Sequence, residues 1–332
     1  MTMFMNRLAQ RCYATATKTS APRAFYQKYN RQIKLAAVGT VAATVLGFAY
    51  CEYDIHTTWT TELDQDKFTR YRISQRVAID PHHYLMEVRP LSKQSVNIWK
   101  KMTSNKIWSI EVKQPEIMIV RNYTPLPLKL TSDNDSNEYE LEQLDIANGE
   151  TNDGKLLFYV KNYDTGEIGR WMRNLDVGSR IDIRGPYVEY EIGNEKKNVT
   201  IMTAGTGIVS ALQILFQKPV DDPVNYNWIH TSNSMAEMGK LFDEVSALGK
   251  KSNVQLTLFD KDHDLRSNLN QLMDLLPENN DDGSFNSEFV SLVCGPEGFI
   301  KTLAGSKVDL NQGPISGILK TKGWSNDNVF KL

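Results

Sequence analysis

The sequence has few cysteines and histidines, and neither residue type is arranged to bind a metal. The three cysteines, Cys12, Cys51 and Cys294, are too few and too widely spaced for a disulfide framework or a zinc site. No Cys-x-x-Cys-His motif is present, so no covalently attached haem is expected. Among the five histidines only His82 and His83 are adjacent, and adjacent residues on a strand point to opposite faces. We interpret this pair as a solvated loop feature and predict no metal site.

Acidic residues are absent from the first 34 positions, which carry seven basic side chains. Such a segment, rich in Arg, Ser, Thr and Ala, is typical of a mitochondrial presequence; a basic tail that binds anionic lipid is the alternative. The rest of the chain has 31 basic and 40 acidic residues, a net charge of −9. This balance does not favour nucleic-acid binding, and no nucleic-acid partner is expected.

Charge is also absent from residues 35–51, LAAVGTVAATVLGFAYC. At about 1.5 Å rise per residue, a helix of this length is at the short end of what spans a bilayer core. A buried core helix is the alternative, but the small residues and the lack of an amphipathic pattern favour one transmembrane helix. Basic residues precede the segment, whereas Glu52 and Asp54 follow it. In the inner mitochondrial membrane, the positive-inside bias would put residues 52–332 in the intermembrane space.

Between Phe68 and about Tyr190 the chain is rich in β-branched and aromatic residues. Partial two-residue alternation predicts six strands, at 68–79, 83–91, 107–115, 117–128, 155–163 and 180–192. Turn formers separate several of them, and six strands at this spacing favour an antiparallel barrel. The segment 132–154, SDNDSNEYELEQLDIANGETNDG, is polar and acidic, and we interpret it as a flexible loop.

After about Lys197, strand-like and helix-like segments alternate. Apolar strands are predicted at 198–205, 224–232, 253–260 and 289–296, and helices at 207–217, 235–248 and 269–276. This alternation favours a doubly wound parallel sheet, in which ligands bind at the carboxyl ends of the strands. Residues 203–207 and 294–296 both fall at such ends.

Two short motifs carry candidate binding chemistry. Gly205 and Gly207 allow a tight turn before a helix, whose free N–H groups favour an anion such as a pyrophosphate. The turn lacks the third glycine of Gly-x-Gly-x-x-Gly, so it departs from an ordinary Rossmann fingerprint. In RNYTP, Arg121 offers donors for a diphosphate, Tyr123 an aromatic face for a flat ring system, and Thr124 a hydroxyl. The alternative is an edge strand with a surface arginine and a half-buried tyrosine.

A third motif, CGPEGF, places the Cys294 thiol at the end of a strand and before a predicted helix. A helix N-terminus can lower the pKa of a thiol, and a small side chain can lie against a planar ring. A buried cysteine that acts as a small apolar residue is the alternative. The three motifs together, in this order and after a barrel, resemble the ferredoxin–NADP reductase superfamily and within it the NADH–cytochrome b5 reductase branch. The resemblance covers residues 68–332.

This resemblance implies an FAD-binding β-barrel domain at 66–192. In the family, the arginine of Arg-x-Tyr-Ser/Thr binds the FAD diphosphate, the tyrosine lies along the flavin and the hydroxyl reaches flavin N5. Arg121, Tyr123 and Thr124 match these positions. The family's strand beside the flavin corresponds here to Val160, Lys161 and Tyr163. A second FAD loop, Gly-x-x-Ser/Thr in the family, corresponds to Gly166, Glu167, Ile168 and Gly169. The last of these, Gly169, cannot supply the usual hydroxyl.

The resemblance also implies an NAD(P)H-binding α/β domain at 197–332. The pyridine-nucleotide turn corresponds to Gly205, Thr206 and Gly207, and the motif beside the nicotinamide to Cys294, Gly295 and Pro296. Ala204 and Ser210 replace a usual glycine and proline, and Phe330 matches the aromatic end that covers the flavin. Thr124 and Cys294 are the candidate catalytic residues, because they would arrange hydride transfer. Residues 230–233 contain neither an acid nor an arginine, so the choice between NADH and NADPH stays open.

Two stretches, 96–130 and 309–332, resemble fungal mitochondrial flavoproteins that assist haem attachment to cytochrome c. This implies an inner-membrane protein whose partners are haem, the cytochrome c haem lyase and apocytochrome c. A reductase of cytochrome b5 or quinones on the outer membrane is one alternative, and a flavin-bound assembly factor with little turnover is another. The segment DLNQGPISGIL, 309–319, is either a docking surface or a structural loop.

Overall fold

The computed structural model describes residues 40, 43, 44, 59–60, 62–132, 138–163, 166–219, 221–260, 269–277, 286–308 and 311–332. The chain divides into two units, Met1–Thr58 and Trp59–Leu332. The predicted presequence lies outside the described residues, and so does the predicted transmembrane helix apart from the helical Thr40, Ala43 and Thr44. Among the residues that are described, none of the helices has the length and apolar character that a membrane span requires.

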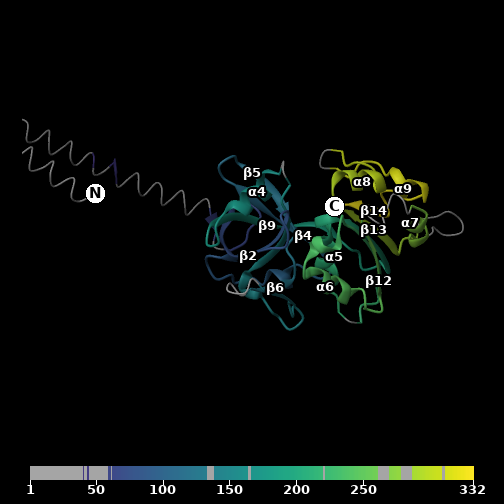
Figure 1. Cartoon of the computed structure of the whole chain (residues 1–332), viewed down its shortest axis with the longest axis horizontal. Coiled ribbons are helices and arrows are strands. Elements are labelled where there is room, and N and C mark those ends of the chain that lie inside the picture. The colour runs from purple at the N-terminus through teal and green to yellow at the C-terminus, as the bar shows by residue number, and fades with distance from the viewer. Residues whose placement is uncertain are drawn as a thin grey trace, which may run out of the picture. The chain divides into compact units, whose positions relative to one another are not determined.

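The N-terminal part of the unit Trp59–Leu332 is an antiparallel sheet of order β5-β4-β9-β2-β3-β8 (Figure 1). Its strands are β2 (Phe68–Ala78), β3 (His83–Pro90), β4 (Lys106–Gln114), β5 (Ile119–Tyr123), β8 (Leu156–Lys161) and β9 (Arg180–Glu191). All six predicted strands are therefore confirmed. A short β1 (Trp59–Thr60) pairs in parallel with the start of β2. A bridge between Leu126 and Leu157 brings β8 back to the segment after β5, so the sheet curls on itself.

The acidic segment 132–154 contains a strand that the sequence interpretation missed. Tyr139–Gln143 form β7, which pairs in antiparallel register with β6 (Leu128–Ser132). Alternation explains this strand, because Tyr139 and Leu141 pack against the core while the glutamates beside them are exposed. A 3-10 helix, η1 (Asn152–Gly154), ends the segment. The prediction of a flexible loop is wrong for these residues.

The second part is a parallel sheet of order β12-β11-β10-β13-β14, which confirms the predicted alternation. The strands are β10 (Asn198–Ala204), β11 (Asn225–Thr231), β12 (Val254–Phe259), β13 (Phe289–Cys294) and β14 (Val329–Lys331). The helices of this part are η2 (Gly205–Gly207), α5 (Ile208–Leu215), η3 (Met235–Met238), α6 (Leu241–Leu248), α7 (Leu269–Leu275), α8 (Glu297–Ala304) and α9 (Gly317–Thr321). Strand order reverses between β10 and β13, so their carboxyl ends form the topological switch point where such sheets bind ligands.

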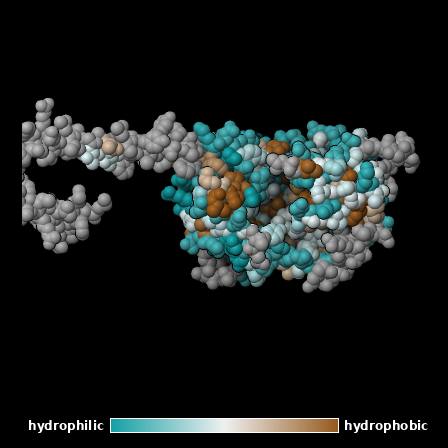
Figure 2. Space-filling view, turned by 90° about the horizontal axis from the view of Figure 1, so that it is seen from above, coloured by the Kyte–Doolittle hydropathy of each residue, from teal (hydrophilic) through white to brown (hydrophobic). Residues whose placement is uncertain are grey.

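The two sheets share one hydrophobic core and are joined through helix α5 (Figure 1). The buried Gln213 of α5 donates from Nε2 to the carbonyl oxygens of Trp108 (3.1 Å) and Pro125 (3.0 Å). Its Oε1 accepts from the Trp108 N–H at 2.8 Å. One side chain thus satisfies three backbone groups of the antiparallel part. These bonds fix the segment after β5 relative to α5. Figure 2 shows that the surface is hollowed where the two parts meet.

The loop before α9 is held by the C-terminal strand. The buried Lys331 donates from Nζ to the carbonyl oxygens of Ser306 and Pro314, at 3.2 Å each. Gln312 donates to the Lys331 carbonyl and accepts from its N–H. For the described residues of 309–319, these bonds favour a structural loop.

Candidate functional site

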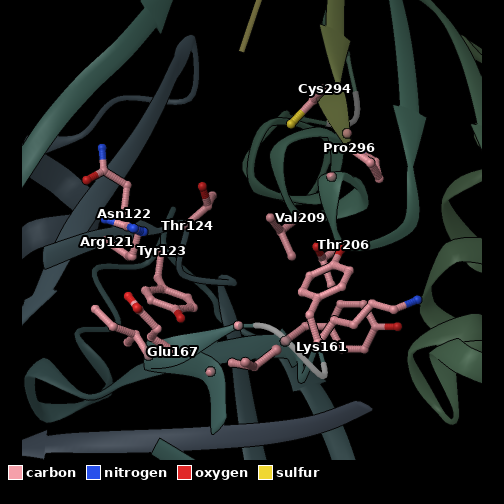
Figure 3. A pocket seen from close by; sticks show the side chains of 18 residues that line it. Arg121, Asn122, Tyr123, Thr124, Lys161, Glu167, Thr206, Val209, Cys294 and Pro296 are labelled. Carbon is pink, nitrogen blue, oxygen red and sulfur yellow. The ribbon is translucent and has the colours of Figure 1, made fainter. Parts of the chain in front are cut away.

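A cavity of about 460 Å³ lies between β5, the segment from β8 to α4 (Glu167–Asn174), and the ends of β10 and β13. This volume is within the range of about 300–1,000 Å³ that is typical of cofactor and ligand pockets. All predicted site residues except Gly205 and Phe330 line the cavity. In Figure 3, Arg121, Tyr123, Thr124 and Glu167 lie on one side, and Thr206, Val209, Cys294 and Pro296 lie on the other.

Strand β5 supplies Arg121 and Tyr123 to one wall, and Thr124 follows directly. The exposed Arg121 donates from Nη1 to the Val120 carbonyl at 3.0 Å. Tyr123 packs edge-on against Phe158, with ring centroids 6.2 Å apart. Burial raises the pKa of Tyr123 although the Arg121 charge lowers it, so the phenol stays protonated. The strand is at the edge of the sheet, as the alternative interpretation requires, but its polar residues also line a cavity, which favours binding.

The N-terminus of α4 forms the adjoining wall. Its N-cap is Gly166, and within the described part of the chain no side chain caps this end, so its first N–H groups favour an anion. A Cβ atom on Gly169 would lie 3.2 Å from the Lys161 carbonyl oxygen, and the Gly169 carbonyl accepts from the Tyr84 hydroxyl at 2.8 Å. Glycine at this position therefore allows α4 to pack closely on β8, at the cost of the hydroxyl expected from the resemblance.

Two glycine-containing turns meet on the opposite wall. Thr203 at the end of β10 pairs in register with Cys294 at the end of β13. A Cβ atom on Gly207 would lie 2.5 Å from the Cys294 carbonyl oxygen, a distance that real Cβ atoms do not adopt. Gly205 does not line the cavity, but its φ of 53° is left-handed and favours glycine. The glycines thus bring the ends of β10 and β13 into contact.

Ser210 and Cys294 link these two turns through side chains. Ser210 Oγ donates to the Gly207 carbonyl at 2.8 Å. Burial raises the pKa of the Cys294 thiol, and a hydrogen bond with Ser210 offsets part of that shift. The expectation that the start of α8 lowers this pKa is therefore wrong in direction, and desolvation is the largest cause of the rise. The thiol is neutral at physiological pH.

Lys161 connects the cavity to a charged cluster between the two sheets. Its Nζ lies 3.9 Å from Glu237 Oε1 of η3 and, in Figure 3, points away from the cavity. His83 Nε2 lies 3.8 Å from the same carboxylate, and His83 Nδ1 is 2.7 Å from Asp80. His83 is buried at the start of β3 and stacks on Tyr159, whereas His82 is exposed. The interpretation of the histidine pair as solvated is thus correct for His82 and wrong for His83.

Three lining residues were not predicted: Asn122, Tyr159 and Val209. Asn122 lies between Arg121 and Tyr123, so a two-residue alternation pointed it away from the site. Tyr159 is two residues before Lys161, so the same alternation could have found it. Phe330 packs on Tyr190 instead of lining the cavity, with ring centroids 4.5 Å apart.

His230 lies under the glycine turn, fully buried at the end of β11. Its Nδ1 is 2.9 Å from Thr203 Oγ1, which also accepts from the Trp228 indole at 3.0 Å. Burial lowers the pKa of His230 to about 3, although a hydrogen bond with Thr203 opposes the shift. The imidazole is therefore neutral in the folded protein.

This neutral histidine predicts a loss of stability in mild acid. The folded pKa lies below the unfolded value of about 6.5, so the unfolded chain binds more protons as the pH falls below that value. Lowering the pH from 7 to about 5.5 should therefore reduce the free energy of unfolding by about 1.3 kcal/mol through His230. Urea unfolding of the wild-type protein and the His230→Gln variant at both pH values measures this difference. Equal pH dependence in the two proteins would contradict the assignment.

The antiparallel sheet followed by a five-stranded parallel sheet, with a cavity at the switch point, defines the fold of ferredoxin–NADP reductases. The chain is similar to the crystal structure of the cytochrome b5 reductase domain of Ulva prolifera nitrate reductase. The TM-score is 0.55 at 15% identity, over 81% of this chain and 99% of that chain, a likeness that shows the fold alone. It is also 28% identical to NADH-cytochrome b5 reductase 2 of Yarrowia lipolytica, over 64% of this chain and 69% of that protein. No family model matches the chain.

A stronger match identifies the family. The chain is 38% identical to the cytochrome c mitochondrial import factor CYC2 of Saccharomyces cerevisiae over 315 residues, which cover 82% of this chain and 84% of that protein. The chain belongs to the family of this import factor.

Proposed function

We propose that this protein is a mitochondrial FAD-dependent oxidoreductase that passes electrons from NAD(P)H to haem during cytochrome c maturation. The observation that carries the proposal is a single cavity that combines the Arg-x-Tyr-Thr motif, an uncapped helix N-terminus and the two glycine-containing turns. The relative named as a cytochrome c import factor supports the role in cytochrome c maturation. The relative named as NADH-cytochrome b5 reductase 2 supports the transfer of electrons from a nicotinamide nucleotide.

The lining residues suit FAD in charge and in shape. Arg121 and the first N–H groups of α4 would hold the diphosphate, since both favour an anion. Tyr123, Val160 and Tyr163 would form the walls for a flat ring. When bound there, FAD would supply the redox chemistry that connects a two-electron donor, NAD(P)H, with a one-electron acceptor, haem. The assignments for the FAD site also include Lys161, Gly166, Glu167, Ile168, Gly169 and, at the chain end, Phe330.

The chain itself would position the two reactants. Gly205, Thr206, Gly207, Cys294, Gly295 and Pro296 would bind the nicotinamide nucleotide at the switch point. A hydrogen bond between Tyr163 and Thr206 links the flavin wall to the glycine turn; burial nonetheless raises the pKa of Tyr163. Thr124 and the neutral Cys294 thiol would face the reacting rings from opposite walls. Hydride transfer requires close alignment and no acid–base pair, which fits the uncharged side chains of Thr124 and Cys294.

The proposal includes a location and partners. Residues 1–34 would be a cleaved presequence and 35–51 a helix in the inner mitochondrial membrane, with the domains 66–192 and 197–332 in the intermembrane space. Haem, the haem lyase and apocytochrome c would be the partners there. The word mitochondrial in the name of the yeast relative supports the organelle.

A flavin-bound assembly factor with little turnover is the second candidate, favoured by the departures from the family motifs at Ala204, Ser210 and Gly169. Stopped-flow mixing of the purified chain with NADPH or NADH distinguishes the two. Bleaching of the flavin followed by reduction of added haem supports the enzyme. Retained FAD without bleaching at millimolar nucleotide supports the assembly factor.

Replacing Arg121 with alanine should weaken FAD binding. Loss of charge-assisted hydrogen bonds to the diphosphate, worth about 1.5–3 kcal/mol, predicts a dissociation constant about 10- to 100-fold higher. Fluorescence titration of the apoprotein with FAD measures the change. Arg180→Ala, on an exposed arginine of β9, is the matched control and should leave the affinity unaltered. If the Arg121 variant binds FAD with unchanged affinity, Arg121 is not part of the FAD site.

A further inference from the structure

We propose that residues 89–101 form a surface that binds an anionic lipid bilayer and so orients the unit Trp59–Leu332 at the membrane. This inference rests on the proposed membrane anchor at 35–51. It concerns a face of the protein whose residues do not line the flavin cavity. We call residues 89–101 the basic loop.

The basic loop has an unusual charge for this chain. No acidic residue occurs between Glu87 and Glu111, and the cations in that stretch are Arg89, Lys93, Lys100, Lys101 and Lys106. The chain beyond residue 34 has a net charge of −9, so an acid-free stretch with five cations stands out. Clustered cations are typical of protein surfaces that contact anionic lipid headgroups.

Exposed apolar side chains lie among these cations. Leu91 is 45% exposed and Val96 is 51% exposed, while Arg89 and Lys93 are exposed beside them. Residues 89–97 line a second cavity, of about 690 Å³, together with Thr151, Asp153, Gly154 and Lys155. Exposed apolar side chains flanked by cations are the combination that binds at a bilayer interface.

The C-terminal half of the basic loop is rigid. The Asn97 side chain caps α3 (Ile98–Lys101), accepting from the N–H groups of Trp99 (3.0 Å) and Lys100 (3.2 Å). Ile98 and Trp99 are buried, so α3 presents Lys100 and Lys101 to solvent. A surface that is already ordered loses little entropy on binding.

The basic loop is also tied to the point where the unit begins. The Leu63 N–H donates to Gln94 Oε1 at 3.0 Å, and the Ser95 N–H donates to Glu62 Oε1 at 2.7 Å. Glu62 follows the end of the uncharged run at Cys51 by eleven residues. Even fully extended, those residues span at most about 40 Å, so a membrane anchor that ends at Cys51 would keep Glu62 within that distance of the bilayer.

Three acidic groups near the loop have cationic or backbone partners. Glu87 is buried and lies 3.4 Å from Lys155 Nζ, and Glu150 pairs with Lys129 Nζ at 2.5 Å. Glu62 accepts from the backbone of the loop itself. Asp153 is exposed at the same cavity, where it is outnumbered by Arg89 and Lys93 together with Lys155. This local surplus of positive charge favours binding to an anionic surface.

Hydrogen–deuterium exchange of the full-length chain in nanodiscs tests the proposal. In nanodiscs of phosphatidylcholine with phosphatidylserine, the amides of 89–97 should exchange at least about tenfold more slowly than in pure phosphatidylcholine. High salt should reverse the effect, because it screens charges at the surface. The double variant Arg89→Gln/Lys93→Gln should lose the protection. The matched control Lys320→Gln, on an exposed lysine of α9, should keep it.

The outcomes separate this proposal from the one on which it rests. Equal exchange in both lipids, or protection that survives in the double variant, overturns the lipid surface and assigns the basic loop to a protein partner or to solvent. Recovery of the chain in the lipid-free fraction overturns the membrane anchor as well. The flavin spectrum of the double variant should match the wild type, which shows that the fold is retained.

Discussion

Replacing Gly207 with alanine should slow flavin reduction by NADPH and NADH at least about 100-fold, because small displacements of reacting groups carry costs of that size. The added Cβ would lie 2.5 Å from the Cys294 carbonyl oxygen and 2.8 Å from its carbonyl carbon. Both atoms belong to the backbone, so no side chain can rotate to relieve the overlap. The two turns must separate, and the nucleotide would then bind away from the flavin wall.

Anaerobic stopped-flow reduction of the bound flavin measures this effect. Gly298→Ala is the matched control, because a Cβ atom at that glycine has nothing within 4 Å in the described structure. FAD content should remain normal in both variants, since neither glycine belongs to the diphosphate wall. A Gly207 variant that is reduced at the wild-type rate would show that contact between the two turns is irrelevant to the reaction.

Replacing Gln213 with leucine should lower the free energy of unfolding by about 3–5 kcal/mol, since each buried backbone group left without a partner costs about 1–3 kcal/mol. Leucine is close to glutamine in size but cannot bond to the backbone of Trp108 and Pro125, which Gln213 satisfies with three hydrogen bonds. The two sheets should also move relative to each other, because α5 loses its polar link to the antiparallel part.

Urea unfolding followed by circular dichroism measures the change. Gln255→Leu is the control, because that glutamine is exposed on β12 and its replacement should shift the midpoint little. A Gln213 variant as stable as the wild type would mean that these three hydrogen bonds do not contribute to holding the two sheets together.

The sequence was most informative where structure depends on local patterns. Two-residue alternation identified all six strands of the antiparallel sheet, because each pattern reports which face of a strand is buried. The same spacing put Arg121 and Tyr123 on one side of β5. Resemblance then nominated residues that the fold brings to one cavity, although it offered no reason for the close contact of Gly207 with Cys294.

Features that depend on distant partners could not be predicted. β7 exists because Tyr139 and Leu141 pack against a core that other segments build, while the composition around them indicates a loop. His83 stacks on Tyr159 and faces Glu237 of η3, and the sequence around His83 reveals neither contact. The pKa of Cys294 is raised by burial, which the position of the thiol before a helix does not report.

The absorption spectrum of the purified full-length chain tests the central proposal most directly. If the cavity between the two sheets holds FAD beside a nicotinamide site, the protein should be yellow, and anaerobic NADPH or NADH should bleach it. A well-folded protein that is colourless and takes up no added FAD would contradict the account.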